Sequence, residues 1–142
     1  MVAKQLSVFI ENRQGRLGEV LNVLKANGVN ILSLSLADTT EYGLLRLIVS
    51  DPITGKEKLA EDGFSTMLTD VLVLKINHEA GSLQGLLKIL AEDNVNIEYM
   101  YGLSIDGDEA SVVLKASDLV KADKVLSLHG VKTLSTDEIA KL

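Results

Sequence analysis

The sequence contains no cysteine and no tryptophan, and it has one proline and two histidines among its 142 residues. Without cysteine, the chain can form neither a disulfide framework nor a thiolate metal site. No apolar run approaches the ~18 residues that a membrane-spanning helix needs. The first ten residues are too interrupted by polar ones for a secretory signal. We therefore expect a cytoplasmic protein with no membrane contact, no metal and no cofactor.

Basic and aromatic residues are also scarce. The chain has 14 Lys and Arg against 20 Asp and Glu, which gives a net charge of −6, and it has two Phe and three Tyr. Binding to nucleic acid requires a basic surface that neutralises phosphates, and single strands also require aromatic side chains for stacking. The composition therefore argues against a nucleic-acid partner.

Hydrophobic residues make up 46% of the chain, and they occur in a repeated pattern. The stretch "GRLGEVLNVLKANGVNI" (15–31) returns 66 residues later as "GSLQGLLKILAEDNVNI" (81–97). Between 11–31 and 77–97, seven of 21 positions are identical. The shared leucines are spaced as one face of a helix, which predicts a helix in each copy, opened by a glycine and closed near Gly or Asn.

The two copies continue with the same elements in the same order. Each has a strand before the glycine, two strands after the helix joined by a turn rich in Thr, Asp and Gly, a second helix and a last strand. An aspartate precedes each second helix as a predicted N-cap, and Ser135 with Glu138 predicts a short terminal helix. The expected strands are 5–10, 31–38, 43–50 and 64–69 in the first copy, and 70–76, 97–105, 109–117 and 131–134 in the second; the second helices are 52–62 and 118–128.

This order predicts an α+β protein made of two ferredoxin-like βαββαβ units, each an antiparallel sheet with two helices on one face. We place the domains at 1–69 and 70–142, packed side by side. The turn between the second and third strands is predicted to be one residue longer in the second copy. Leu32, Leu34 and Leu36 form an apolar row that would need cover if it faced away from the helices, and a dimer through the open sheet would provide that cover.

The loops "ENRQGRLG" (11–18) and "NHEAGSLQ" (77–84) join a strand to a helix N-terminus. Unpaired N–H groups and a partial positive charge make such a terminus suitable for an anion, and a carboxylate fits better than a phosphate because no Gly-rich cradle follows. The alternative is that both glycines only form the turn.

Each copy has a strand, a polar loop with Gly-x-Leu, a helix and then "GVNI" or "NVNI", and this order resembles the ACT domain family. The pattern occurs twice, and the resemblance spans nearly the whole chain. It implies a regulatory protein whose effector, most often a free amino acid, binds at the interface between two paired units. It also implies a homodimer and a metabolic enzyme as possible partners. The family's acidic position is Asn12 or His78 here, and its proline is Gln14 or Ala80.

Carried onto this sequence, the resemblance implies one candidate ligand site in each loop. Backbone N–H groups after each glycine would hold a carboxylate, Asn12 or His78 would hydrogen-bond the ligand, and the entry to the second strand would receive the ammonium group. The candidate residues are Asn12, Gly15, Arg16, Leu17, Asn30, Ile31, His78, Gly81, Ser82, Leu83, Asn96 and Ile97.

Catalysis is not expected, because no nucleophile–base arrangement is visible in the sequence. A small acylphosphatase-like hydrolase is a weak alternative, since Arg13 and Gly15 resemble its loop but Glu79 replaces Arg13 in the second copy. A stronger alternative is a protein–protein adaptor that regulates a separately encoded metabolic enzyme.

Overall fold

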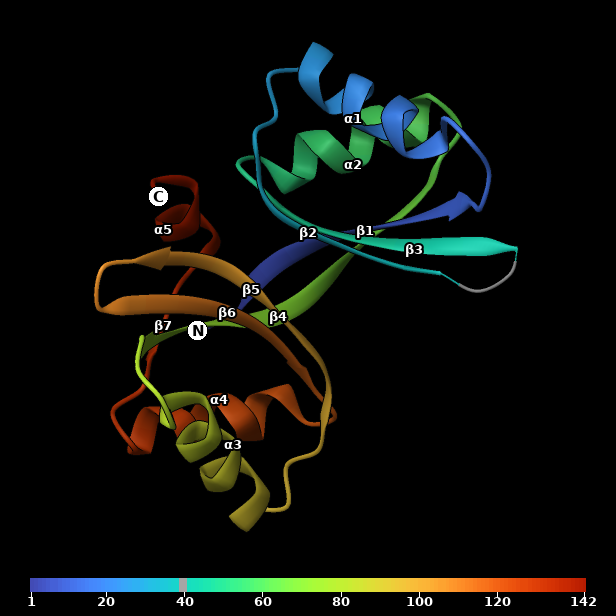
Figure 1. Cartoon of the computed structure of the whole chain (residues 1–142). Coiled ribbons are helices and arrows are strands. Elements are labelled where there is room, and N and C mark those ends of the chain that lie inside the picture. Colours follow the sequence, from blue (N-terminus) through green and yellow to red (C-terminus); the bar gives the residue numbers. More distant parts are fainter. Residues whose placement is uncertain (39–40) are drawn as a thin grey trace. The chain divides into compact units, whose positions relative to one another are not determined.

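The computed structural model describes residues 1–38 and 41–142, which form two compact units (Figure 1). The N-terminal unit comprises residues 4–69 with 140–142, and the C-terminal unit comprises residues 1–3 with 70–139. One strand, β4 (Ser65–Asn77), runs through the boundary between residues 69 and 70.

The elements follow the predicted βαββαβ order twice, so the fold class is confirmed. The first copy consists of β1 (Ala3–Glu11), α1 (Arg16–Ala26), β2 (Ile31–Asp38), β3 (Tyr42–Val49), α2 (Pro52–Glu61) and β4. The second continues from β4 with α3 (Ser82–Glu92), β5 (Ile97–Asp106), β6 (Glu109–Ala116), α4 (Leu119–Leu128) and β7 (Lys132–Thr133), and α5 (Thr136–Ala140) follows.

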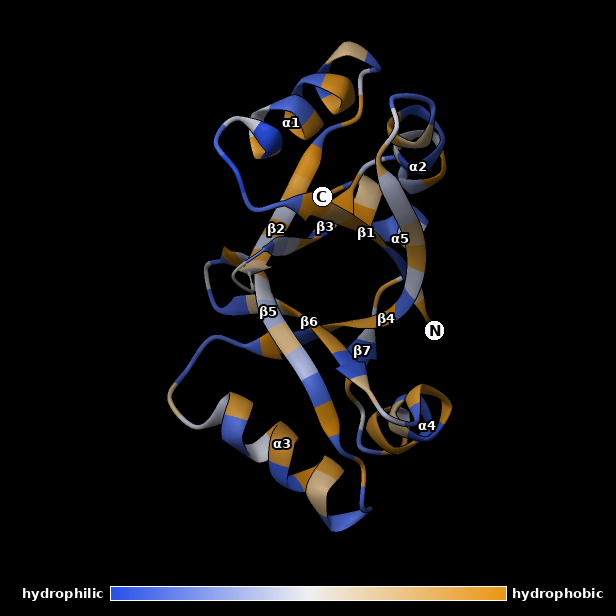
Figure 2. Cartoon of the chain, turned by 90° about the vertical axis from the view of Figure 1, so that its right-hand side faces the viewer, coloured by the Kyte–Doolittle hydropathy of each residue, from blue (hydrophilic) through white to orange (hydrophobic). Residues whose placement is uncertain are grey.

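Each unit has an antiparallel sheet with its two long helices on one face (Figure 1). The strand order is β2-β3-β1-β4 in the N-terminal unit, and β5-β6-β4 with β7 on the other side of β4 in the C-terminal unit. Successive side chains of a strand point to opposite faces of the sheet, so every second side chain faces the helices. Figure 2 shows polar and apolar residues interleaved along α1 and α3, as expected for helices with one buried face.

Equivalent positions of the two copies build the two cores. Leu24 of α1 and Leu90 of α3, one repeat apart, are both fully buried. The N-terminal core consists of Leu6, Val8, Ile10, Val20, Leu24, Val29, Leu45, Leu47, Val49, Leu59 and Phe64. The C-terminal core consists of Leu72, Leu74, Leu86, Leu90, Val95, Leu114, Ala116, Ala122, Val125 and Leu126.

The predicted N-caps are confirmed. The Asp51 carboxylate accepts a hydrogen bond from the Thr54 amide at 3.1 Å, and the Asp118 carboxylate accepts one from the Lys121 amide at 3.0 Å. Hydrogen bonds donated by the Thr54 hydroxyl and amide hold the pKa of Asp51 below its usual value. The Ser135 hydroxyl likewise accepts a hydrogen bond from the Glu138 amide at 3.1 Å.

The row formed by Leu34 and Leu36 faces the helices. Leu34 lies opposite Leu47 and Leu36 opposite Leu45, and both partners belong to the core under the helices. The two leucines are still 43% and 46% exposed, because β2 is the outermost strand. These leucines do not lie on the open face of the sheet, so they give no reason to expect a dimer through that face.

The extra residue of the second copy lies in a strand, so its predicted place in the turn is wrong. The pairing of β5 with β6 shifts between Gly102 and Ser104, whereas β2 and β3 stay in register from Ser33 to Asp38. Such a β-bulge places an additional residue on one strand and bends it. Two residues of the first predicted turn, Thr39 and Thr40, lie outside the described residues.

Candidate functional site

Both glycine loops have the same backbone conformation. Gly15 and Gly81 are the N-cap residues of α1 and α3, with φ angles of 88° and 89°. These are left-handed angles that glycine adopts without steric cost. Neither N-cap has a side chain to accept a hydrogen bond from the first turn. The first amide of each helix donates a long hydrogen bond within the loop, from Arg16 to the Arg13 carbonyl at 3.4 Å and from Ser82 to the Glu79 carbonyl at 3.3 Å. The amides that follow in the first turn are the ones that an anion could use.

In the C-terminal unit, this loop borders a cavity of about 500 Å³. One side is polar, with His78 and Glu79 in the loop and Ser82 in the first turn of α3. The loop is fixed at its base, because the His78 amide donates a hydrogen bond to the Asp108 carbonyl at 2.6 Å. The other lining residues are Ile76, Asn77, Leu83, Gly102, Leu103, Ser104, Ile105, Ala110, Ser111 and Val112.

A second cavity of about 400 Å³ lies beside the first turn of α3. It shares Ile76, Asn77 and Ser82 with the larger cavity. The Lys75 ammonium group at its edge forms an ion pair with Glu109 at 3.2 Å. Leu86, Ile89, Gly130, Val131 and Lys132 complete the lining.

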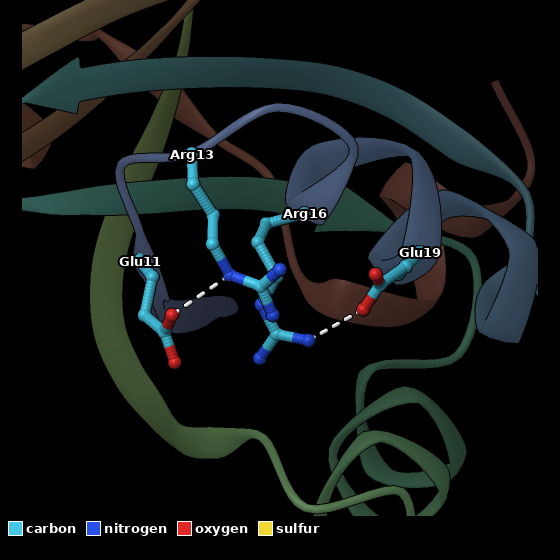
Figure 3. A network of polar contacts seen from close by, with 4 residues as sticks. All are labelled: Glu11, Arg13, Arg16 and Glu19. Carbon is cyan, nitrogen blue, oxygen red and sulfur yellow. Dashed lines mark hydrogen bonds and ion pairs between the residues drawn. The ribbon is translucent and has the colours of Figure 1, made fainter.

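In the N-terminal unit, the arginines of the loop contact carboxylates of the same segment (Figure 3). The Arg13 guanidinium is 2.8 Å from the Glu11 carboxylate, and Arg16 pairs with Glu19. The Arg16 guanidinium also lies over the Phe64 ring, 4.4 Å from its centroid. The Arg16 side chain is 19% exposed, so it packs onto the unit rather than extending into solvent.

The predicted residues at the strand entries lie away from the glycine loops of their own units. Asn30 and Ile31 follow the C-terminal end of α1, and an 11-residue helix separates them from Gly15, about 16 Å at 1.5 Å per residue. They line a separate cavity of about 420 Å³ with Leu21, Lys25, Gly28 and Val29. Asn96 and Ile97 follow α3 in the same way, and the Asn96 carbonyl accepts a hydrogen bond from the Ser117 amide.

A model of the ACT domain pair matches residues 1–142, the whole chain. The chain belongs to the ACT domain family. The predicted family is thus confirmed, and with it the regulatory fold that the family shares. Among curated proteins, none matches the chain significantly.

Solved structures agree with this ACT domain pair. The crystal structure of protein BT0572 from Bacteroides thetaiotaomicron has a TM-score of 0.95 at 38% identity, covering 100% of this chain and 98% of that one. The regulatory subunits of aspartate kinase from Thermus thermophilus and Thermus flavus share the fold, with TM-scores of 0.60 and 0.59 at 15% and 18% identity. The match covers 88% of this chain in both cases, and 91% and 90% of those chains.

The structure of the ACT domain pair also reveals lining residues that were not predicted. Of the predicted residues, His78, Ser82 and Leu83 line the large cavity, whereas its β5 side and Glu79 were not among the candidates. The change of repeat offset from 66 to 67 was the available signal for the β5 side. Within the described part of the chain, no group of three or more His, Asp or Glu side chains is placed to hold a metal, and no helix has the length and apolarity to cross a membrane.

Proposed function

We propose that this ACT domain pair is a regulatory sensor that binds a free amino acid and catalyses no reaction itself. The observation that carries the proposal is the 500 Å³ cavity of the C-terminal unit, where a polar loop and a helix N-terminus meet an apolar wall. That volume lies in the usual range for small-molecule sites, ~300–1,000 Å³. We also propose that a neighbouring unit contributes contacts to the same ligand, as the family resemblance implies.

The chemistry of the cavity suits a zwitterion at its polar side. A carboxylate would accept hydrogen bonds from the first-turn N–H groups of α3, and it would be favoured by the helix dipole. The carboxylate of Glu79 would pair with the ammonium group; Glu79 directly follows His78, which stands at the acidic position of the family. His78 and Ser82 would add hydrogen bonds and fix the orientation of the ligand.

The test is thermal unfolding of the whole chain with each of the twenty amino acids. A ligand at one hundred times its Kd should stabilise the folded state by about 2.7 kcal/mol. Glu79→Gln should remove most of that stabilisation, whereas Glu92→Gln, at the far end of α3 and outside the cavity, should leave it unchanged. If none of the amino acids raises the melting temperature, the proposed function is wrong.

A homodimer remains part of the proposal, with the edge of the N-terminal sheet as the contact. β2 is the outermost strand in the strand order, and Leu34 and Leu36 leave apolar surface exposed on it. Exposed edges of this kind pair readily with a second strand. Leu36→Lys should shift the protein toward a monomer in sedimentation experiments, and an unchanged mass would remove this edge as the contact.

Control of a separately encoded metabolic enzyme is the alternative that stays open. It is compatible with amino-acid binding, because a sensor without its own catalysis must act on another protein. The hydrolase alternative is weakened by the ion pair between Arg13 and Glu11, which engages the guanidinium that would bind a phosphate. A phosphatase assay that detects turnover would revive it.

A further inference from the structure

The larger cavity lies where the two copies differ in the second strand. Leu36 in β2 lies opposite Leu45, and Gly102 in β5 lies opposite Val112, which is the same place in the repeat. The Leu36 side chain fills this place in the N-terminal unit, since its Cδ1 atom lies 3.2 Å from where a Cβ atom of Gly43 would be. A Cβ atom built on Gly102 would meet no heavy atom within 4 Å.

The β-bulge acts at the same point. It adds Leu103 to β5 directly after Gly102, and both residues line the cavity together with Ser104 and Ile105. The β2 strand has no register shift at the corresponding place. The C-terminal unit therefore has a glycine and a β-bulge where the N-terminal unit has a leucine in a regular strand.

The smaller cavity reflects a second difference between the copies. Ser82 and Val131 line it, and their counterparts in the N-terminal unit are Arg16 and Phe64. There the arginine covers the phenylalanine ring and pairs with Glu19, whose counterpart is Gly85. Three small residues thus replace a packed cluster of Arg, Phe and Glu.

We infer that the two units have different roles: of the two glycine loops, only that of the C-terminal unit binds the effector, and the effector is an amino acid with an aliphatic side chain. This inference rests on the proposed function and deepens it. In the N-terminal unit, Leu36, Arg16 and Phe64 occupy the space that a ligand would need. In the C-terminal unit, Gly102 and Ser82 leave that space open on both sides of the loop.

The lining residues determine the class of ligand. Besides polar side chains, the cavity is lined by five large apolar ones, which are Ile76, Leu83, Leu103, Ile105 and Val112. Among the described residues, no lysine or arginine lines this cavity, so an acidic side chain would have neither of them to pair with. Each CH₂ group buried against the wall should raise affinity about fourfold.

Isothermal titration calorimetry of the whole chain tests both the number of binding sites and the class of amino acid that binds. L-leucine should bind with one site per chain, more than tenfold tighter than L-alanine, and L-glutamate and L-lysine should bind more weakly than L-leucine. Gly102→Leu, which places the side chain of Leu36 into the C-terminal unit, should weaken L-leucine binding more than twentyfold. The matched control is Gly18→Leu in α1, a site with open space around its Cβ position, and it should bind as the natural chain does.

Ser82→Arg serves as the second variant, because it narrows the site from the helix side and does not alter a strand. The circular dichroism spectrum and unfolding midpoint of each variant establish that it is folded. Two sites per chain, equal affinity for L-glutamate, or full affinity in folded Gly102→Leu and Ser82→Arg would each overturn the inference while the proposed function stands. If no amino acid binds to the natural chain, the proposed function fails, and the inference fails with it.

Discussion

Two glycines four residues apart at the start of α3 should respond to substitution by alanine in opposite directions. Gly81 is the N-cap with φ 89° and ψ −12°, and Gly85 lies inside the helix. A Cβ atom at either position would meet no heavy atom within 4 Å, so no steric clash contributes at either site. The difference between Gly81→Ala and Gly85→Ala therefore depends on backbone conformation.

The expected magnitudes follow from that conformation. A left-handed backbone costs an L-residue roughly 1–2 kcal/mol, so Gly81→Ala should lower the free energy of unfolding by about that amount. Alanine within a helix is favoured over glycine by about 0.5–1 kcal/mol, so Gly85→Ala should raise it. The two variants should differ by about 2 kcal/mol. Gly81→Asn should lose less than Gly81→Ala, because asparagine tolerates left-handed angles better.

Urea unfolding, followed by circular dichroism, measures these differences. With a slope of ~2 kcal/mol per molar urea, the midpoints of the two alanine variants should lie roughly 1 M apart. If both midpoints move in the same direction, or if Gly81→Ala is as stable as the natural chain, the backbone argument is refuted. Because the expected loss is smaller than a typical unfolding free energy, about 5–15 kcal/mol, Gly81→Val should also fold, so its effect on ligand binding can be measured.

The remaining predictions concern caps and cores. Asp51→Ala should cost about 1 kcal/mol at neutral pH. Hydrogen bonds from Thr54 lower the pKa of Asp51 in the folded state, so the stability that the ionised Asp51 contributes should be present in full above the usual pKa of 3.8 and shrink as the pH falls through the lowered pKa. Urea unfolding at neutral and acidic pH measures this change. A loss in Asp51→Ala that is independent of pH would contradict it. Leu24→Ala and Leu90→Ala should each cost about 2–5 kcal/mol, whereas Leu128→Ala, at a side chain that is 77% exposed, should change stability by less than about 0.5 kcal/mol. Equal losses at all three leucines would contradict the core assignment.

Much of the fold could be predicted because local patterns determine it. The spacing of leucines predicts α1 and α3, and an aspartate before each of α2 and α4 predicts where those helices begin. Because the pattern occurs twice, each element was predicted from two separate stretches of the sequence. The domain boundaries at 1–69 and 70–142 and the ligand roles of the loop residues remain predictions.

The candidate site was less accessible to such reasoning. His78, Ser82 and Leu83 belong to a recognisable loop, but the β5 side of the cavity depends on which strand residue lies opposite Val112. Pairing register is a property of two strands, so one inserted residue can be placed in the turn or in the strand with equal support from the sequence.

The sequence by itself determined the repeat, the order of the elements, the caps and the buried faces, because these follow from interactions within a few residues or from periodicity. The tertiary structure decided which copy has open space beside its glycine loop. Arg16 contacts Phe64, which is far from it in sequence, and the pairing of strands decides that Leu36 in one unit and Gly102 in the other stand beside the equivalent position of the neighbouring strand. A cavity is defined by the side chains that several elements bring to one place, and packing density makes one leucine or one arginine enough to fill it.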